Sequence, residues 1–170
     1  MRRSIVAIAF GLLLFGGRFE AASAQSPLPK EGSGKTTIYY TGSLKALPAG
    51  EDVVAVTYDV LGIVTNNSGH GMFHLLSTQC VGGFTAIKGD FANEQGICTY
   101  VDRDGDKVFS RHTGTGRRGQ NATVKSELVG GTGKYTGISG TIETTRTVLR
   151  PTSPSVAHTV AEGTFSYKLP

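Results

Sequence analysis

The chain has 170 residues, of which 38% are hydrophobic and 18% are charged, and its formal net charge is +4. This length suits one domain whose core needs neither a structural metal nor several disulfides. Beyond the N-terminus the one basic cluster, Arg117-Arg118, lies between glycines. This pattern is typical of a solvated loop and lacks the broad basic face of nucleic-acid-binding proteins, so no nucleic-acid partner is expected.

Residues 1–24 have the pattern of a secretory signal peptide. Arg2 and Arg3 precede an uncharged apolar run over 5–15, and Ala22-Ser-Ala24 is a small-x-small cleavage pattern. The run is much shorter than the roughly 20 apolar residues that a membrane-spanning helix needs. We therefore expect cleavage before Gln25 and a periplasmic or secreted protein, with no membrane contact once the leader is removed.

The mature chain is expected to consist of a flexible lead-in and one domain. The leader holds three arginines and one glutamate, so its removal lowers the formal net charge from +4 to +2. Residues 25–34 are polar and rich in proline and glycine, which is typical of a flexible segment. Residues 35–170 are assigned to the domain.

Runs rich in Val, Ile, Thr, Tyr and Phe fill this domain, and Gly, Asn, Asp or Pro divides them. No window has a 3.6-residue apolar stripe, so long helices are not expected. Eight or nine evenly spaced strands predict a closed antiparallel β-barrel or a sandwich, and closure would remove exposed sheet edges. The predicted strands lie near 36–44, 52–65, 70–80, 84–91, 96–102, 107–113, 121–129, 138–148 and 156–168.

The chain has two cysteines, Cys80 and Cys98. In an exported protein an even, minimal count favours a disulfide, which could stabilise the fold by roughly 3 kcal/mol. A free catalytic thiol near His74 or His112 is the alternative. No metal site is expected, because no neighbouring cysteine or histidine pair has metal-ligand spacing.

The segment Asp102-Arg-Asp-Gly-Asp106 places three carboxylates at alternate positions. A calcium loop of the EF-hand type would need glycine at its sixth position and glutamate at its twelfth, where the chain has Lys107 and Thr113. Asp104-Gly105 instead matches a tight hairpin turn. We therefore predict a turn between two strands, with loose cation binding as the alternative.

A glycine-rich segment follows, Val129-Gly-Gly-Thr-Gly-Lys-Tyr-Thr-Gly-Ile-Ser-Gly140. It resembles a segment of allene oxide cyclases and dirigent proteins, and Cys98-Thr-Tyr-Val-Asp-Arg-Asp-Gly-Asp-Lys-Val-Phe109 is similar to one found with it in small exported bacterial proteins of that superfamily. The resemblance covers about residues 80 to 145. It implies an eight-stranded antiparallel barrel of the calycin-like type, often oligomeric, with a cavity for an apolar small molecule. The catalytic residues of the plant enzymes have no matching motif in the N-terminal half.

Polar side chains on otherwise apolar strands are the candidates for a ligand site. His74 is expected to share a strand face with Met72 and Leu76, and Tyr58, Tyr100 and Arg111 complete the predicted ligand-binding set. Period-two alternation separates Arg111 from His112, so both cannot point inward. An ordinary strand role for His74 is the alternative. The full set of candidate polar residues is Tyr58, His74, Tyr100, Arg111, His112, Glu143 and Arg146.

The sequence predicts an exported barrel that binds a small apolar or amphipathic molecule, without a cofactor. Neither glycine-rich segment, near residue 33 or near residue 115, precedes a helix pattern that could hold a nucleotide phosphate. A cofactor-free isomerase or cyclase is the first alternative, so the enzyme question stays open. The second is a structural or interaction protein with a filled barrel, and a homo-oligomer is compatible with all three.

Overall fold

The computed structural model describes residues 28–151, 153 and 156–170. The expected leader and the first part of the lead-in lie outside these residues. Within the described part, no helix has the length and apolar character that a membrane crossing requires.

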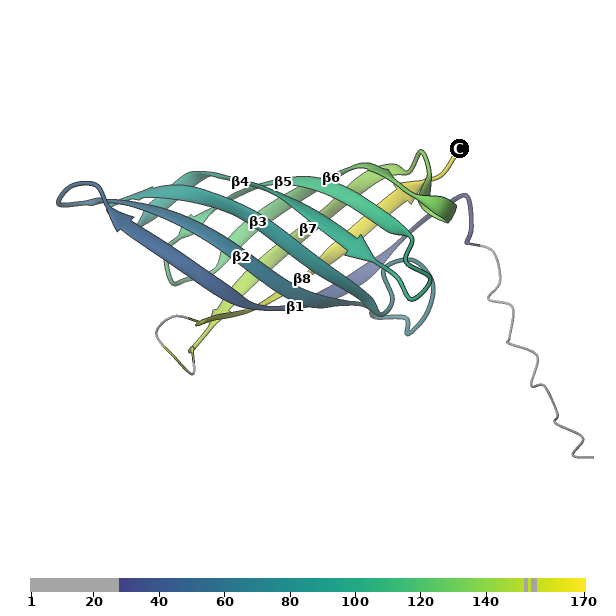
Figure 1. The fold of residues 1–170 in the computed structure, drawn as a ribbon, viewed down its shortest axis with the longest axis horizontal. Coiled ribbons are helices and arrows are strands. Elements are labelled where there is room, and N and C mark those ends of the chain that lie inside the picture. Colours follow the sequence, from purple (N-terminus) through teal and green to yellow (C-terminus); the bar gives the residue numbers. More distant parts are fainter. Residues whose placement is uncertain (1–27, 152, 154–155) are drawn as a thin grey trace, which may run out of the picture.

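The described chain forms a closed eight-stranded antiparallel barrel, so the predicted barrel is confirmed (Figure 1). Each strand pairs with the next along the chain, and β1 closes the barrel on β8 in a register that runs from Glu31 opposite Lys168 to Ser43 opposite Val156. A single short 3₁₀ helix, η1, is found in the described residues. The strands are β1 (Glu31–Pro48), β2 (Val53–Asn66), β3 (Leu76–Ile87), β4 (Asp90–Val101), β5 (Lys107–Arg117), β6 (Ala122–Gly131), β7 (Ser139–Leu149) and β8 (Val156–Lys168), and η1 spans Gly133–Tyr135.

Nine predicted runs become eight strands because the run at 84–91 contains a hairpin turn. Lys88 and Gly89 both have positive φ, 51° and 89°, which is the backbone of a tight turn between β3 and β4. Residues 84–87 end β3 and residues 90–91 begin β4. At the N-terminus β1 begins at Glu31, within the segment expected to be a flexible lead-in.

One end of the barrel is closed by the long β2–β3 connection. Residues 70–75 form turns in place of the predicted strand, and Phe73 has a positive φ of 59°. Its fully buried ring packs edge-on against Tyr100 and Phe165. Tyr135 of η1 belongs to the same apolar cluster, so this end of the barrel is filled by side chains.

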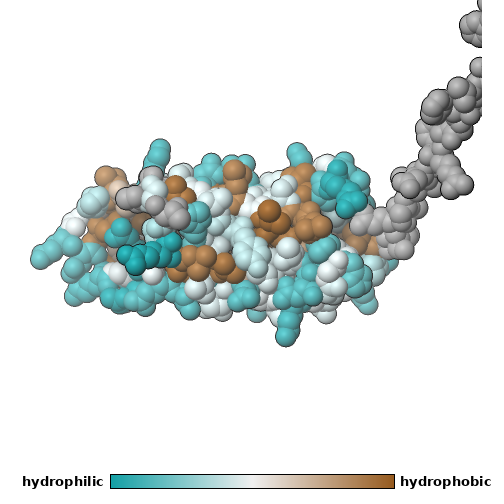
Figure 2. Space-filling model, turned by 90° about the horizontal axis from the view of Figure 1, so that it is seen from below, coloured by the Kyte–Doolittle hydropathy of each residue, from teal (hydrophilic) through white to brown (hydrophobic). Residues whose placement is uncertain are grey.

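The outer surface of the barrel is mixed in character. Figure 2 shows apolar side chains in separate patches among hydrophilic ones on the face seen from below. A shallow hollow over β1, β2 and β8 is lined by Tyr39, Leu61, Ile63 and Val160. Elsewhere exposed ion pairs cross between strands, as between Lys125 and Glu143.

The two motifs that carry the family resemblance pack against each other at the closed end. Asp102 accepts hydrogen bonds from the backbone amides of Asp104 and Asp106, so the acidic segment forms the predicted turn between β4 and β5. The ammonium group of Lys134, in the glycine-rich segment, lies 2.6 Å from an Asp102 oxygen and 2.7 Å from an Asp104 oxygen. The position before Lys134 must be glycine, because a Cβ on Gly133 would lie 1.8 Å from Asp106 Oδ1.

Lys134 therefore occupies the place that a bound cation would take among these carboxylates. The described residues contain no group of three or more side chains suited to hold a metal ion. The Lys134 ammonium and the hydrogen bonds to Asp102 outweigh the effect of burial and lower the pKa of that carboxyl group.

Replacing Lys134 with methionine should lower the free energy of unfolding by about 1–2 kcal/mol, because a nearly buried carboxylate loses its cation. Urea unfolding of the two proteins measures the difference. Lys125→Met, which breaks an ion pair with both partners exposed, is the matched control and should cost under about 1 kcal/mol. Equal losses in the two variants, or a wild-type melting temperature that falls on adding a chelator, would contradict this account.

Candidate functional site

The barrel contains an interior cavity of about 330 Å³ on the side away from the closed end. It extends from Tyr100 and the Cys80–Cys98 disulfide to the hairpin between β5 and β6. Most of its wall is aliphatic or aromatic. The apolar lining includes Ile38, Leu44, Val56, Val60, Phe84, Phe91, Val124, Ile142, Val148 and Ala161, and the polar lining includes Tyr40, Tyr58, His112, Ser126, Thr144, Arg146 and Thr159.

A buried ion pair anchors the polar part of this wall. Glu94 is 0% exposed, and its two oxygens accept hydrogen bonds from Nη1 and Nη2 of Arg146 at 2.6 and 2.8 Å. This two-point geometry is the strongest form of arginine–carboxylate pairing, and it is needed because a lone charge in an apolar interior would be costly. The pair therefore places two opposite charges inside the barrel and leaves no net charge there.

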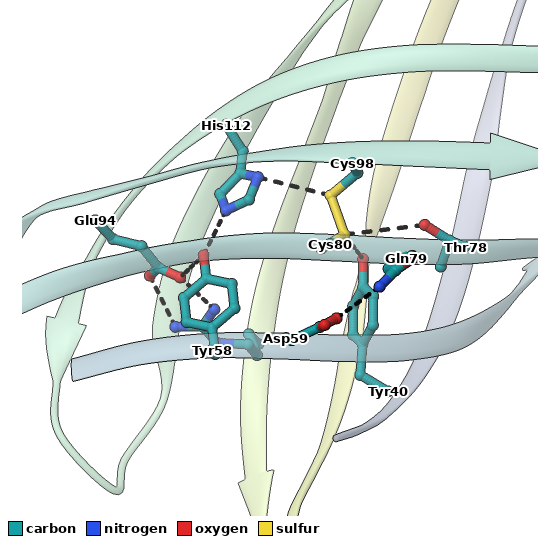
Figure 3. Close-up of a disulfide and its surroundings, with 10 residues drawn as sticks. Tyr40, Tyr58, Asp59, Thr78, Gln79, Cys80, Glu94, Cys98 and His112 are labelled. Atoms are coloured by element: carbon teal, nitrogen blue, oxygen red, sulfur yellow. Dashed lines mark hydrogen bonds and ion pairs between the residues drawn. A yellow bond between two sulfur atoms is a disulfide. The ribbon is translucent and has the colours of Figure 1, made fainter. Parts of the chain in front are cut away.

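Tyr58 and His112 extend the ion pair into a hydrogen-bonded cluster of four residues. The Tyr58 hydroxyl donates to Glu94 Oε1 at 2.9 Å and lies 2.6 Å from His112 Nε2. Figure 3 shows the Tyr58, Glu94 and His112 side chains pointing toward one another, from three different strands. The four residues come from β2, β4, β5 and β7, so the cluster joins the neighbouring strands β4 and β5 to two strands that pair with neither of them.

A bulge in β4 turns Glu94 into the barrel. Phe91 pairs with Gly116 and Glu94 pairs with Gly114, so β4 holds one residue more than β5 over this stretch. Phe91 and Glu94 consequently both point inward, although an odd separation of three places residues on opposite faces of a regular strand. The Asn93 side chain accepts a hydrogen bond from the Thr85 backbone amide at 3.1 Å and holds the bulge.

Three glycines on adjacent strands make room for the large polar side chains. A Cβ on Gly82 would lie 2.5 Å from the Tyr58 hydroxyl, and one on Gly96 would lie 2.5 Å from Cε1 of the His112 ring. Gly114 has the same relation to Glu94, at 2.4 Å. Side chains of β2, β4 and β5 can therefore cross over neighbouring strands and meet.

The hydrogen bonds of the cluster determine how its protons are arranged. The carboxylate of Glu94 can only accept, so the single hydroxyl proton of Tyr58 is used there, and His112 Nε2 must donate to the tyrosine oxygen. In a neutral ring the other nitrogen, Nδ1, then carries no hydrogen. It lies 3.6 Å from Cys98 Sγ.

Burial lowers the pKa of His112 and favours the neutral ring, and the Arg146 charge acts in the same direction against the opposing effect of Glu94. Burial and then the Glu94 carboxylate raise the pKa of Tyr58, so its hydroxyl keeps its proton. The chain of donors from His112 through Tyr58 to Glu94 is thus consistent with the charge states that the surroundings favour.

The predicted disulfide between Cys80 and Cys98 is present. The two residues stand directly opposite each other on β3 and β4, and both side chains face the interior and line the cavity. The described residues include no free cysteine, so a catalytic thiol is not available while the bridge is intact.

The structure brings some of the predicted ligand residues together and separates others. Tyr58 and Tyr100 line the cavity. His74 does not: it lies in the β2–β3 connection, and the shared face with Met72 and Leu76 does not exist because residues 70–75 are not a strand. Arg111 points outward, with its side chain 69% exposed and paired with Glu127.

The predicted alternation along β5 is confirmed, since His112 is buried and Arg111 is exposed. Among the wider set of candidates Arg146 belongs to the cluster, whereas Glu143 pairs with Lys125 on the outer surface. The strand pattern does not identify Glu94, which falls between two predicted strands at 84–91 and 96–102. Nor does it identify Tyr40, because the run 36–44 gives no sign of which face is internal.

Comparison with protein-family models and with curated proteins finds no match for this chain. The candidate site is therefore interpreted from its own geometry.

The free energy of unfolding should fall as the pH drops below about 6.5, because His112 takes up a proton more readily in the unfolded chain than in the barrel. Its contribution is complete above that pH and is lost as the pH falls toward the lowered pKa of the folded state, with a slope of at most about 1.4 kcal/mol per pH unit. Urea unfolding between pH 7.5 and 5 measures it.

His112→Gln should flatten this pH dependence, because glutamine can donate to Tyr58 but does not titrate. The matched control is His70→Gln, in the exposed part of the β2–β3 connection, which should retain the wild-type slope. An unchanged slope in His112→Gln would contradict the placement of a neutral histidine in the cluster.

Proposed function

We propose that this protein is an exported barrel that binds a small apolar or amphipathic molecule in its interior. The observation that carries the proposal is the cavity of about 330 Å³, which lies within the size range of small-molecule sites and has a largely apolar wall with a few polar groups. Burial of a ligand there would contribute roughly 25 cal/mol per Å² of apolar surface.

Export and family membership belong to the same proposal. The leader-like N-terminus supports export, and the Cys80–Cys98 disulfide suits an oxidising compartment. The closed eight-stranded barrel and the contact between the acidic turn and the glycine-rich segment support a relationship to the allene oxide cyclase and dirigent superfamily.

A cofactor-free isomerase or cyclase is the second candidate, and the cluster at the cavity wall favours it. His112 and Tyr58 share a short hydrogen bond beside the ligand space, and such a pair could move a proton on a bound molecule. Conversion of a retained ligand to an isomer by the wild-type protein, but not by folded His112→Gln, would support this function. Recovery of the ligand unchanged from both proteins would contradict it.

The purified protein should bind an apolar fluorescent probe such as N-phenyl-1-naphthylamine in a saturable manner at micromolar concentration. Val124→Trp should abolish binding by filling the cavity, because Val124 lines it. Thr123→Trp is the matched control, since Thr123 is exposed on the same strand. Fluorescence titration measures both variants, and circular dichroism verifies their folding.

Native mass spectrometry of the protein from the exported fraction should in addition reveal a retained lipophilic molecule. A folded wild-type protein without saturable binding, or a Val124→Trp variant that binds like the wild type, would contradict an interior ligand site.

A further inference from the structure

The cluster of Glu94, Arg146, His112 and Tyr58 at the cavity wall carries no net charge. The charges of Glu94 and Arg146 neutralise each other through two hydrogen bonds, and the surroundings favour neutral His112 and Tyr58. A carboxylate entering this space would lose its hydration and would have to compete with Glu94 for Arg146.

The other cationic side chains along the cavity lie near the β5–β6 hairpin, at the end away from the disulfide. Arg117 is paired with Asp90 at 3.0 Å, and Arg118 stands in the exposed turn between β5 and β6. The inner half of the cavity, near the disulfide, therefore favours an uncharged group.

Tyr40 supplies a hydrogen-bond donor at this inner end. Its side chain comes from β1, lines the cavity and points toward the disulfide in Figure 3. Within the described residues its hydroxyl has one polar contact, Cys80 Sγ at 3.7 Å. A disulfide sulfur has no hydrogen to give and accepts only weakly, so the phenolic proton has no strong acceptor among the described residues.

Two further observations distinguish Tyr40 from the other tyrosines of the wall. Tyr58 already uses its proton on Glu94, and Tyr100 is only 1% exposed and packs against Phe73. Tyr40 is half-buried, and burial followed by the nearby Tyr100 raises its pKa well above the usual value, so it remains a donor over the physiological pH range.

We propose that the cavity selects an uncharged lipophilic molecule that carries an oxygen acceptor, such as a ketone, aldehyde or ester, and that the Tyr40 hydroxyl donates a hydrogen bond to this oxygen beside the Cys80–Cys98 bridge. The apolar body of the molecule extends along Phe84, Phe91 and Val124 toward the β5–β6 turn. This inference rests on the proposed ligand-binding function and adds the chemical class of the ligand.

The test compares three molecules of equal chain length, 2-nonanone, nonane and nonanoate, by displacement of N-phenyl-1-naphthylamine from the full protein. A hydrogen bond of about 1.4 kcal/mol corresponds to a tenfold difference in affinity, so the ketone should bind roughly ten times more tightly to the wild-type protein than to Tyr40→Phe. Nonanoate should bind more weakly than the ketone. Tyr40→Phe should therefore lower the ratio of ketone to nonane affinity about tenfold and leave nonane binding unchanged.

Tyr39→Phe is the matched control, because Tyr39 is the neighbouring residue on β1, is 54% exposed and points outward. It should keep the wild-type ratio. If Tyr40→Phe does not fold, the wild-type protein itself provides the test. A hydrogen bond from Tyr40 should shift the carbonyl stretching band of bound ¹³C-labelled 2-nonanone to a lower frequency than in hexane.

The outcomes separate this inference from the function on which it rests. An unshifted carbonyl band, or a Tyr40→Phe variant with the wild-type ratio of ketone to nonane affinity, would overturn the role of Tyr40 while interior binding stands. Tighter binding of nonanoate, lost in Arg118→Gln, would overturn it in favour of an anion held at the β5–β6 turn. No binding of any of the three molecules to the folded protein would overturn both.

Discussion

Closure of the sheet by β1 and β8 is the constraint on which the rest of the structure depends. These strands are more than a hundred residues apart in the chain, yet thirteen residue pairs join them from Glu31–Lys168 to Ser43–Val156. Closure satisfies both sheet edges and gives every strand one face that is shielded from water. The cavity, the buried ion pair and the disulfide all lie on that inner face.

Inside the closed barrel, the buried charge of Glu94 sets strict requirements on its neighbours. Removing Arg146 alone would leave an unpaired carboxylate in an apolar interior, a change that typically costs about 3–5 kcal/mol. The bulge that turns Glu94 inward and the glycines opposite the large side chains are therefore parts of one arrangement. The same arrangement keeps the middle of the barrel from being filled by aliphatic side chains, which leaves a polar wall beside an apolar space.

The two ends of the barrel have different physical roles. At one end aromatic side chains of the β2–β3 connection and of η1 fill the interior. Lys134 forms ion pairs with Asp102 and Asp104 at the same end. Toward the other end the wall consists of apolar side chains, with Phe84 and Phe91 among them, around open space. A molecule that enters from the hairpin end would thus meet the apolar wall first and the tyrosines and disulfide last. This order agrees with a ligand whose polar atom lies deep in the barrel.

The sequence by itself determined the elements that depend on local patterns: the β-strands and their glycine and aspartate turns, the hairpin at Asp104-Gly105, and the cysteine pairing that an even count of two allows. Alternation along β5 also separated His112 from Arg111 correctly. Only the tertiary structure decided which polar residues meet, because that depends on which face of each strand points inward and on where the register shifts. Glu94 falls between two predicted strands, and only the bulge in β4 turns it inward. His74 was misplaced because residues 70–75 leave the sheet, with positive φ at Phe73 and Leu75. A single inserted residue moves the following side chains of a strand to the opposite face of the barrel. The strand pattern alone does not show where such an insertion occurs.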